Sequence, residues 1–224
     1  MENLEQVKLK NSSEGQTATY SLNQFADMSK EEIKASLRKP GPEITSVKTN
    51  PLKVDNLLQN LDWRTRGIIT NVKNQGQCDS SYAFVVVEAL TALNAVDDEN
   101  VIEYSAQELI DCSSTVDNGG CNGGSIQSAY QYVMQNGIQT AASYPYTGVP
   151  GKCKADKKAT RYTPDQFNII PINDNDAMLQ AVNYLPISVG IASADLVFYK
   201  SGIVSQCRST SIDQYMLVVG YGTD

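Results

Sequence analysis

The chain has 224 residues, of which 41% are hydrophobic and 19% are charged. This balance is typical of one globular domain, with or without a short arm. The net charge is −7, and an acidic chain is a poor partner for polyphosphates, so nucleic acid is not expected as a partner. No apolar run reaches the ~18 residues that a membrane span needs.

The N-terminal part predicts a helical arm followed by a linker. Its first residues contain no apolar core of the kind that marks a signal peptide. A helix is predicted over residues 2–10, and a second one after Ser29, which fits an N-cap with Glu31 and Glu32 in the first turn. Residues 39–60 are rich in proline and poor in large apolar residues, which indicates an extended linker.

From Leu61 the composition is that of a compact domain. Residues 80–96 are apolar almost all round, with Glu88 as their only charge. A helix without a polar face belongs inside a domain. A shorter helix is predicted after Ser105, with Glu108 three residues further on as the partner of a capping box.

A third helix is predicted over residues 125–136 and is closed by Gly137. After Pro145 come short apolar runs separated by glycine, proline and serine, which predict strands. These runs cover residues 167–172, 187–192, 201–205 and 216–222. Helices followed by strands indicate an α+β fold in two layers or lobes.

The segment "LDWRTRGIITNVKNQGQCDSSYAF" resembles the start of the mature domain of papain-like cysteine proteases, the cathepsin family. That family has D-W-R followed by N-Q-G-x-C-G-S-C-W-A-F. The segments "SAQELIDC", "GCNGG", "YPYTGVPGKC" and "VVGYG" resemble later motifs of the same family, in the same order. The resemblance implies a papain-like two-lobed α+β fold, with a helical lobe and an incomplete β-barrel lobe.

The arm resembles the inhibitory propeptide of the same family, because "NLEQVKLKN" and "SLNQFAD" are similar to its two motifs. Residues 1–38 are therefore expected to be a partial propeptide, and residues 39–60 a linker that lies across the cleft. Residues 61–224 are expected to be a papain-like domain whose C-terminal part is missing. An unrelated helical arm is the alternative.

The resemblance also identifies positions for the reaction. Peptide hydrolysis by this route needs a thiolate, a base, a group that orients the base, and donors for the oxyanion. The nucleophile position falls on Ser81, the base position on Gln214 and the oxyanion position on Gln75. Glutamine does not titrate and the chain has no histidine, so no functional catalytic residue is expected. Tyr215 replaces a small residue and is expected to fill part of the cleft.

Three further residues match positions that line the substrate cleft in the family. They are Gly123, Gly124 and Asp213. Asp79 stands where the family has glycine, and places a negative charge beside a site that would have to build negative charge.

The resemblance pairs Cys78 with Cys121, and Cys112 with Cys153. Each bridge closes a loop of about 40 residues and stabilises the fold by ~3–4 kcal/mol. Cys207 is expected to be unpaired, because its partner in the family lies beyond the end of this chain. In a reducing compartment all five would be thiols. Zinc spacings are absent, so neither a metal nor another cofactor is expected.

These observations predict a pseudoprotease that serves as a structural or binding subunit of a protein assembly. Its own linker is expected to stay in the cleft, and other subunits are expected to cover the incomplete β lobe. One alternative is a residual hydrolase that uses Ser81, with Lys73 as a conceivable base. The other is a propeptide-type inhibitor of an active relative. The family suggests a secretory, lysosomal or extracellular location, while the sequence itself names no compartment.

Overall fold

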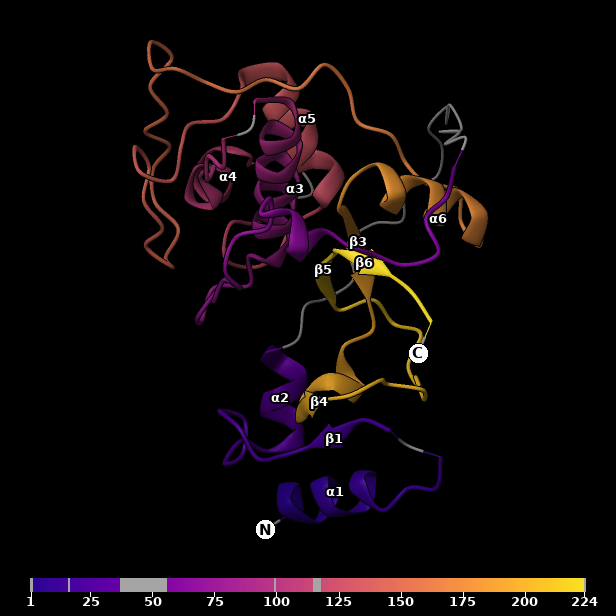
Figure 1. Ribbon diagram of the computed structural model, residues 1–224. Coiled ribbons are helices and arrows are strands. Elements are labelled where there is room, and N and C mark those ends of the chain that lie inside the picture. Colours follow the sequence, from indigo (N-terminus) through magenta and orange to yellow (C-terminus); the bar gives the residue numbers. More distant parts are fainter. Residues whose placement is uncertain (1, 16, 37–55, 99, 115–117, 224) are drawn as a thin grey trace. The chain divides into compact units, whose positions relative to one another are not determined.

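The computed structural model describes residues 2–15, 17–36, 56–98, 100–114 and 118–223. The chain divides into two compact units (Figure 1). The N-terminal unit combines Met1–Pro40 with Gly190–Gln214, and the main unit combines Gly41–Val189 with Tyr215–Asp224. Most of the linker predicted over residues 39–60 lies outside the described residues.

Two α-helices, a 3-10 helix and a strand pair make up the described part of the N-terminal unit. They are α1 (Glu2–Asn11), β1 (Thr19–Tyr20), α2 (Lys30–Ser36), η2 (Ala194–Leu196) and β4 (Tyr199–Ser201). The strands β1 and β4 pair antiparallel. A buried cluster joins the two parts of the chain in this unit, and comprises Val7, Ala18, Tyr20, Ile33 and Phe198.

Side chains fix the C-terminal end of α1 and the N-terminal end of α2. The Asn11 amide accepts a hydrogen bond from the Tyr20 backbone at 2.7 Å and donates one to the Tyr20 carbonyl at 2.9 Å. Ser29 and Glu32 form a reciprocal capping box, with N···O distances of 2.7 and 3.1 Å. The two helices predicted for the arm are therefore present, and the second begins after Ser29 as predicted.

The main unit contains four α-helices and one complete strand pair in its described part. Its elements are β2 (Leu61–Asp62), η1 (Trp63–Arg66), α3 (Ser81–Asp98), α4 (Ala106–Cys112), α5 (Ile126–Asn136), α6 (Asn175–Tyr184) and β6 (Gly220–Tyr221). The strands β2 and β6 pair antiparallel. Two further strands, β3 (Ile187–Ile191) and β5 (Gln214–Val218), pair with each other where the chain passes between the units.

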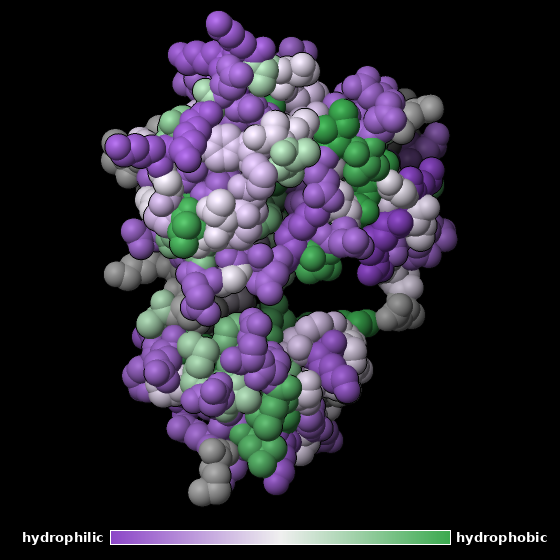
Figure 2. All heavy atoms as spheres, turned by 90° about the vertical axis from the view of Figure 1, so that its left-hand side faces the viewer, coloured by the Kyte–Doolittle hydropathy of each residue, from purple (hydrophilic) through white to green (hydrophobic). Residues whose placement is uncertain are grey.

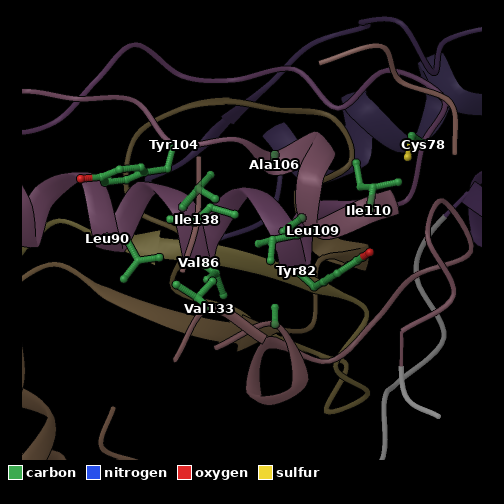
Figure 3. Packing of buried hydrophobic residues seen from close by; sticks show 13 residues of the cluster. Cys78, Tyr82, Val86, Leu90, Tyr104, Ala106, Leu109, Ile110, Val133 and Ile138 are labelled. Carbon is green, nitrogen blue, oxygen red and sulfur yellow. The ribbon is translucent and has the colours of Figure 1, made fainter. Parts of the chain in front are cut away.

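The core of the main unit lies between α3, α4 and α5. Figure 3 shows Tyr82, Val86 and Leu90 of α3 close to the side chains of the neighbouring elements. These neighbours include Leu109, Ile110, Val133 and Ile138. The helix predicted over residues 80–96 is therefore confirmed as a buried one, because its apolar side chains meet protein on several sides.

Two disulfides join segments of the main unit. Cys78 is bonded to Cys121, and Cys112 to Cys153. Both pairs are the ones that the family resemblance implies. Cys207 is an exposed free thiol.

Several sequence predictions of secondary structure were wrong in detail. Residues 167–172 form no strand, because Pro171 offers no backbone donor and Phe167 packs by stacking on Tyr130 instead. The helix α6 was not predicted, although Asp174 caps it by accepting from the Ala177 backbone. Glu108 does not complete a capping box, because its carboxylate is bound elsewhere.

The surface is mixed in character. Figure 2 shows one face on which hydrophobic residues form small groups among hydrophilic ones. The exposed large apolar side chains are scattered over the chain. Singly exposed apolar residues of this kind are normal on protein surfaces. They include Leu9, Val72, Val149, Ile172 and Ile203. None of the helices in the described ranges is long and apolar enough to cross a membrane.

Candidate functional site

Ser81 is the first residue of α3 and is almost enclosed. It is 5% exposed, and its hydroxyl accepts a long hydrogen bond of 3.4 Å from the Tyr215 backbone N–H. The helix N-terminus would stabilise a developing negative charge at this place. A serine hydroxyl remains neutral, however, unless a base takes its proton.

Gln75 lies at the same helix start. Its side-chain oxygen accepts a hydrogen bond from the Ser80 backbone at 3.2 Å. The Tyr146 hydroxyl donates to the Gln75 carbonyl at 2.6 Å and lies 3.1 Å from the Ser80 hydroxyl. Gln75 is therefore fixed from two sides next to the N-terminus of α3, where an oxyanion donor would be needed.

A glycine loop packs against the first turn of α3. A Cβ atom on Gly124 would lie 2.5 Å from Asn118 Oδ1 and 2.9 Å from the Tyr82 ring. Gly123 has a φ of 92°, which favours glycine. The Tyr82 hydroxyl donates to the Gly120 carbonyl at 3.2 Å. The structure thus brings the predicted Gly123 and Gly124 next to the helix that carries Ser81.

Covalent and backbone links hold this arrangement together. The Cys78–Cys121 disulfide connects the segment before α3 with the glycine loop. The Asp79 backbone also donates to the Cys121 carbonyl at 3.1 Å. Because both links lie within a few residues of Ser81, the helix start and the loop are positioned as one piece.

Gln214 is the first residue of β5, directly before Tyr215. Its neighbour Asp213 is buried, and its carboxylate accepts a hydrogen bond of 2.6 Å from the Ser193 backbone. The Asp213 backbone donates to the Ile191 carbonyl at 3.0 Å. Asp213 is therefore hydrogen-bonded to the end of β3 and the loop that follows it, and these residues belong to the N-terminal unit.

Lys73 makes its ion pairs with carboxylates. Its ammonium lies 2.8 Å from Glu103 Oε1 and 4.0 Å from Glu88 Oε1. Burial raises the pKa of the Glu88 carboxyl, while a hydrogen bond from Thr70 and the charge of Lys73 act in the opposite direction. The described ion pairs of Lys73 are thus made with Glu88 and Glu103. They give no support to a serine–lysine dyad.

The described ranges contain no group of three or more histidine, cysteine, aspartate or glutamate residues that could hold a metal ion.

Sequence reasoning missed two residues that shape this site. Tyr146 ties Gln75 to the helix start, and Asn118 fills the space next to Gly124 while its side chain accepts from the Ser125 backbone at 2.6 Å. Tyr146 stands within the "YPYTGVPGKC" segment that resembles the family, so the sequence could have identified it as a site residue. Asn118 carried no such signal.

Two family descriptions match the sequence. "Papain family cysteine protease" matches residues 57–224. "Cathepsin propeptide inhibitor domain (I29)" matches residues 1–33.

Plant proteases are among the similar proteins. The oryzain beta chain of Oryza sativa subsp. japonica is 36% identical over 211 residues, which cover 91% of this chain and 45% of that protein. The KDEL-tailed cysteine endopeptidase CEP2 of Arabidopsis thaliana is 35% identical over 218 residues, which cover 91% of this chain and 60% of that protein. The chain therefore spans about half of the length of these curated relatives.

Solved structures of proforms are similar over the whole chain. The proform of the ragweed pollen allergen Amb a 11, a cysteine protease, is 29% identical with a TM-score of 0.88, and the match covers 100% of this chain and 72% of that one. Digestive procathepsin L 3 of the Tenebrio molitor larval midgut is 31% identical with a TM-score of 0.86, covering 100% of this chain and 75% of that one.

Proposed function

Because this chain belongs to the papain family of cysteine proteases, we propose that it is a pseudoprotease, which has kept the fold and lost the reaction. The observation that carries the proposal is the setting of Ser81. It stands at the nucleophile position, is 5% exposed, and belongs to a chain without histidine. Among the similar proteins named above, CEP2 is described as a cysteine endopeptidase and Amb a 11 as a cysteine protease, so the proposed loss concerns a few side chains on a shared fold.

The expected loss of activity is large. Removing nucleophile and base in a comparable hydrolase costs on the order of 10⁶ in turnover. The oxyanion position Gln75 remains in place beside α3, but oxyanion stabilisation alone leaves only a weak catalyst. Gln214 at the base position accepts no proton in the useful pH range.

A fold without turnover is useful for binding or architecture. We therefore propose that the protein acts as a structural or binding subunit, with other protein subunits as its partners. The matched propeptide, residues 1–33, would then be retained, because a chain without protease activity does not remove it by self-cleavage. N-terminal sequencing of the native protein tests this point: a mature form that starts near Leu61 would contradict retention.

Activity assays test the central claim directly. The purified chain is incubated with fluorogenic peptide substrates and separately with a fluorophosphonate probe, beside Ser81→Ala as the matched control and an active papain-family protease as the positive control. We expect neither turnover nor labelling above the level of Ser81→Ala. Turnover or labelling that disappears in Ser81→Ala would establish the residual hydrolase instead.

The subunit role has its own test. Sedimentation of the protein from its natural source should show it in a complex larger than the single chain. A species that sediments as the free chain at the native concentration would overturn that part of the proposal and leave the loss of catalysis untouched.

A second candidate function is inhibition of an active relative, which the propeptide match over residues 1–33 favours. In this chain the same residues already pack with Phe198 in one buried cluster. They would have to leave that cluster to reach another enzyme. Titration of a cathepsin L-type protease with the full chain decides the matter, since stoichiometric inhibition would support this candidate and undiminished activity would remove it.

A further inference from the structure

Tyr215 meets the nucleophile position in two ways. Its backbone N–H reaches the Ser81 hydroxyl at 3.4 Å. Its side chain, which is partly buried, packs against the buried cluster between α3, α4 and α5. Both residues belong to the main unit. One residue of β5 therefore contacts Ser81 through its backbone and packs its side chain onto the neighbouring apolar core.

We infer that Tyr215 closes the site around Ser81 against ligands, as an inhibitory contact built into the fold. A group that reacts with or binds the hydroxyl must come within about 3–3.5 Å of it. At 5% exposure Ser81 leaves little room for such an approach. An aromatic side chain buries ~150–250 Å² in a favourable site, so moving the Tyr215 ring aside costs free energy that a ligand would have to supply.

The surroundings of Ser81 reinforce the closure. The Tyr82 side chain is fully buried under the glycine loop, and Gly124 lies against its ring without room for a Cβ atom. The next residue of α3, Tyr82, is thus held beneath the glycine loop, while the Tyr215 backbone contacts the Ser81 hydroxyl. Because Tyr82 is also held by its hydrogen bond to the Gly120 carbonyl, we assign the closure to Tyr215.

This inference rests on the proposed function and makes it more specific. If the site is closed by its own side chain, a partner is recognised on other surfaces of the fold.

Thiol labelling tests the closure without requiring catalysis. The variant Ser81→Cys introduces a thiol at the covered position, and the exposed free thiol of Cys207 serves as the internal reference. Iodoacetamide labelling at both positions is followed by peptide mapping and mass spectrometry. We expect position 81 to react at least about 10-fold more slowly than Cys207, because it is nearly enclosed. Equal rates would overturn the inference at once.

The same measurement in Tyr215 variants assigns the closure to this side chain. In the Ser81→Cys background, Tyr215→Ala should raise the rate at position 81 at least about 10-fold, while Tyr215→Phe should leave it slow, since it keeps the ring. Tyr215→Leu should give an intermediate rate and is the less disruptive variant. Rates at position 81 that do not differ among Phe, Leu and Ala at position 215 would overturn the assignment.

The labelling experiment and the activity assays can fail separately. A closed position 81 together with hydrolysis by the unmodified chain would refute the pseudoprotease. A reactive position 81 together with no hydrolysis would refute the closure. Thermal melts of each variant, with the disulfides intact, verify that differences in rate come from folded protein.

Discussion

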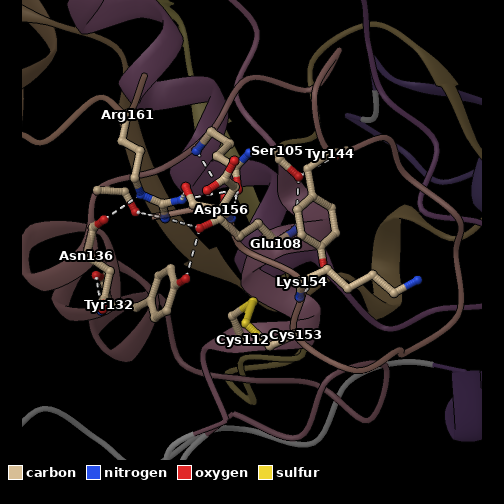
Figure 4. A network of polar contacts seen from close by, with 12 residues as sticks. Ser105, Glu108, Cys112, Tyr132, Asn136, Tyr144, Cys153, Lys154, Asp156 and Arg161 are labelled. Atoms are coloured by element: carbon tan, nitrogen blue, oxygen red, sulfur yellow. Dashed lines mark hydrogen bonds and ion pairs between the residues drawn. A yellow bond between two sulfur atoms is a disulfide. The ribbon is translucent and has the colours of Figure 1, made fainter. Parts of the chain in front are cut away.

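Glu108 and Arg161 form a buried ion pair in the main unit. The Glu108 side chain is fully buried and the Arg161 side chain is 11% exposed. The carboxylate also accepts from the Tyr132 hydroxyl at 2.9 Å and from the Gln139 backbone at 3.0 Å. The guanidinium donates in addition to backbone carbonyls, including that of Asn136 at 2.6 Å (Figure 4). This network joins α4 to the segment that follows the Cys112–Cys153 disulfide.

We predict that Arg161→Ala lowers the free energy of unfolding by about 3–5 kcal/mol, because it leaves the Glu108 carboxylate buried without its counter-charge. The measurement is denaturant unfolding with the disulfides intact. The double variant Glu108→Gln with Arg161→Ala should recover part of this loss, since burying a neutral amide costs less free energy than burying a carboxylate.

Arg64 provides the matched control, because it forms an ion pair with Asp62 while its side chain is 71% exposed. Arg64→Ala should change stability far less than Arg161→Ala, since exposed pairs contribute little. Equal losses in the two single variants would contradict the role given to burial.

Glu88 should make stability depend on pH. Burial is the main reason that the pKa of its carboxyl is raised in the folded chain. Above the unfolded-state value of about 4.3, the folded protein binds more protons at this group than the unfolded one. The contribution of Glu88 to stability is therefore greatest below that value and is lost as the pH rises through the raised folded pKa.

The variant Glu88→Gln removes this titration. We predict that its free energy of unfolding, relative to the unmodified chain, improves as the pH increases from about 4 to 7. Thermal melts across this range measure the trend. Glu103→Gln, which also removes a carboxylate partner of Lys73, is the control and should show a much smaller rising difference, because the charge of Glu103 is only a minor cause of the raised pKa of Glu88. A flat difference for Glu88→Gln would contradict the prediction.

Gly124 should not tolerate a side chain. Its Cβ would meet Asn118 Oδ1 and the Tyr82 ring at under 3 Å, so Gly124→Ala is predicted to destabilise the fold by about 1–3 kcal/mol. Gly119 lies in the same loop, where a Cβ would have contacts no closer than 3.4 Å. Gly119→Ala should stay within about 0.5 kcal/mol. Denaturant unfolding compares the two, and a similar loss in both would exclude the steric explanation.

Asn3 should be essential for the loop between β1 and α2. Its buried amide donates to three backbone carbonyls, at 2.7 Å to Met28, 2.9 Å to Ala26 and 3.3 Å to Phe25. A carboxylate cannot donate, and leaving a buried group unpaired costs about 1–3 kcal/mol. Asn3→Asp should therefore increase amide hydrogen exchange in residues 17–36 by about 10-fold.

Gln24→Glu is the control for this change, because it makes the same amide-to-carboxylate conversion on an exposed residue of the same loop. Its exchange rates should stay close to those of the unmodified chain. Equal acceleration in the two variants would point to charge alone, rather than to the three hydrogen bonds of Asn3.

Local patterns predicted much of the fold. Ser29 and Ser105 were recognised as helix caps, and both accept the hydrogen bond expected of a cap. The apolar run at residues 80–96 correctly predicted a buried helix. Such features depend on residues within one or two turns of each other, so they are readable from spacing alone. The run at residues 167–172 shows the limit, because whether an apolar run becomes a strand depends on a partner strand elsewhere.

By itself, the sequence determined the family, the presence of serine at position 81 and the absence of histidine. Only the tertiary structure decided which side chains surround these positions. The contact between Ser81 and Tyr215 joins residues 134 positions apart, and that between Glu108 and Arg161 joins residues 53 positions apart. Spacing along the chain carries no information about such partners, because packing of separate elements brings them together. The motif around Ser81 therefore predicted a site without its reaction, and only the fold brought the Tyr215 backbone to the Ser81 hydroxyl.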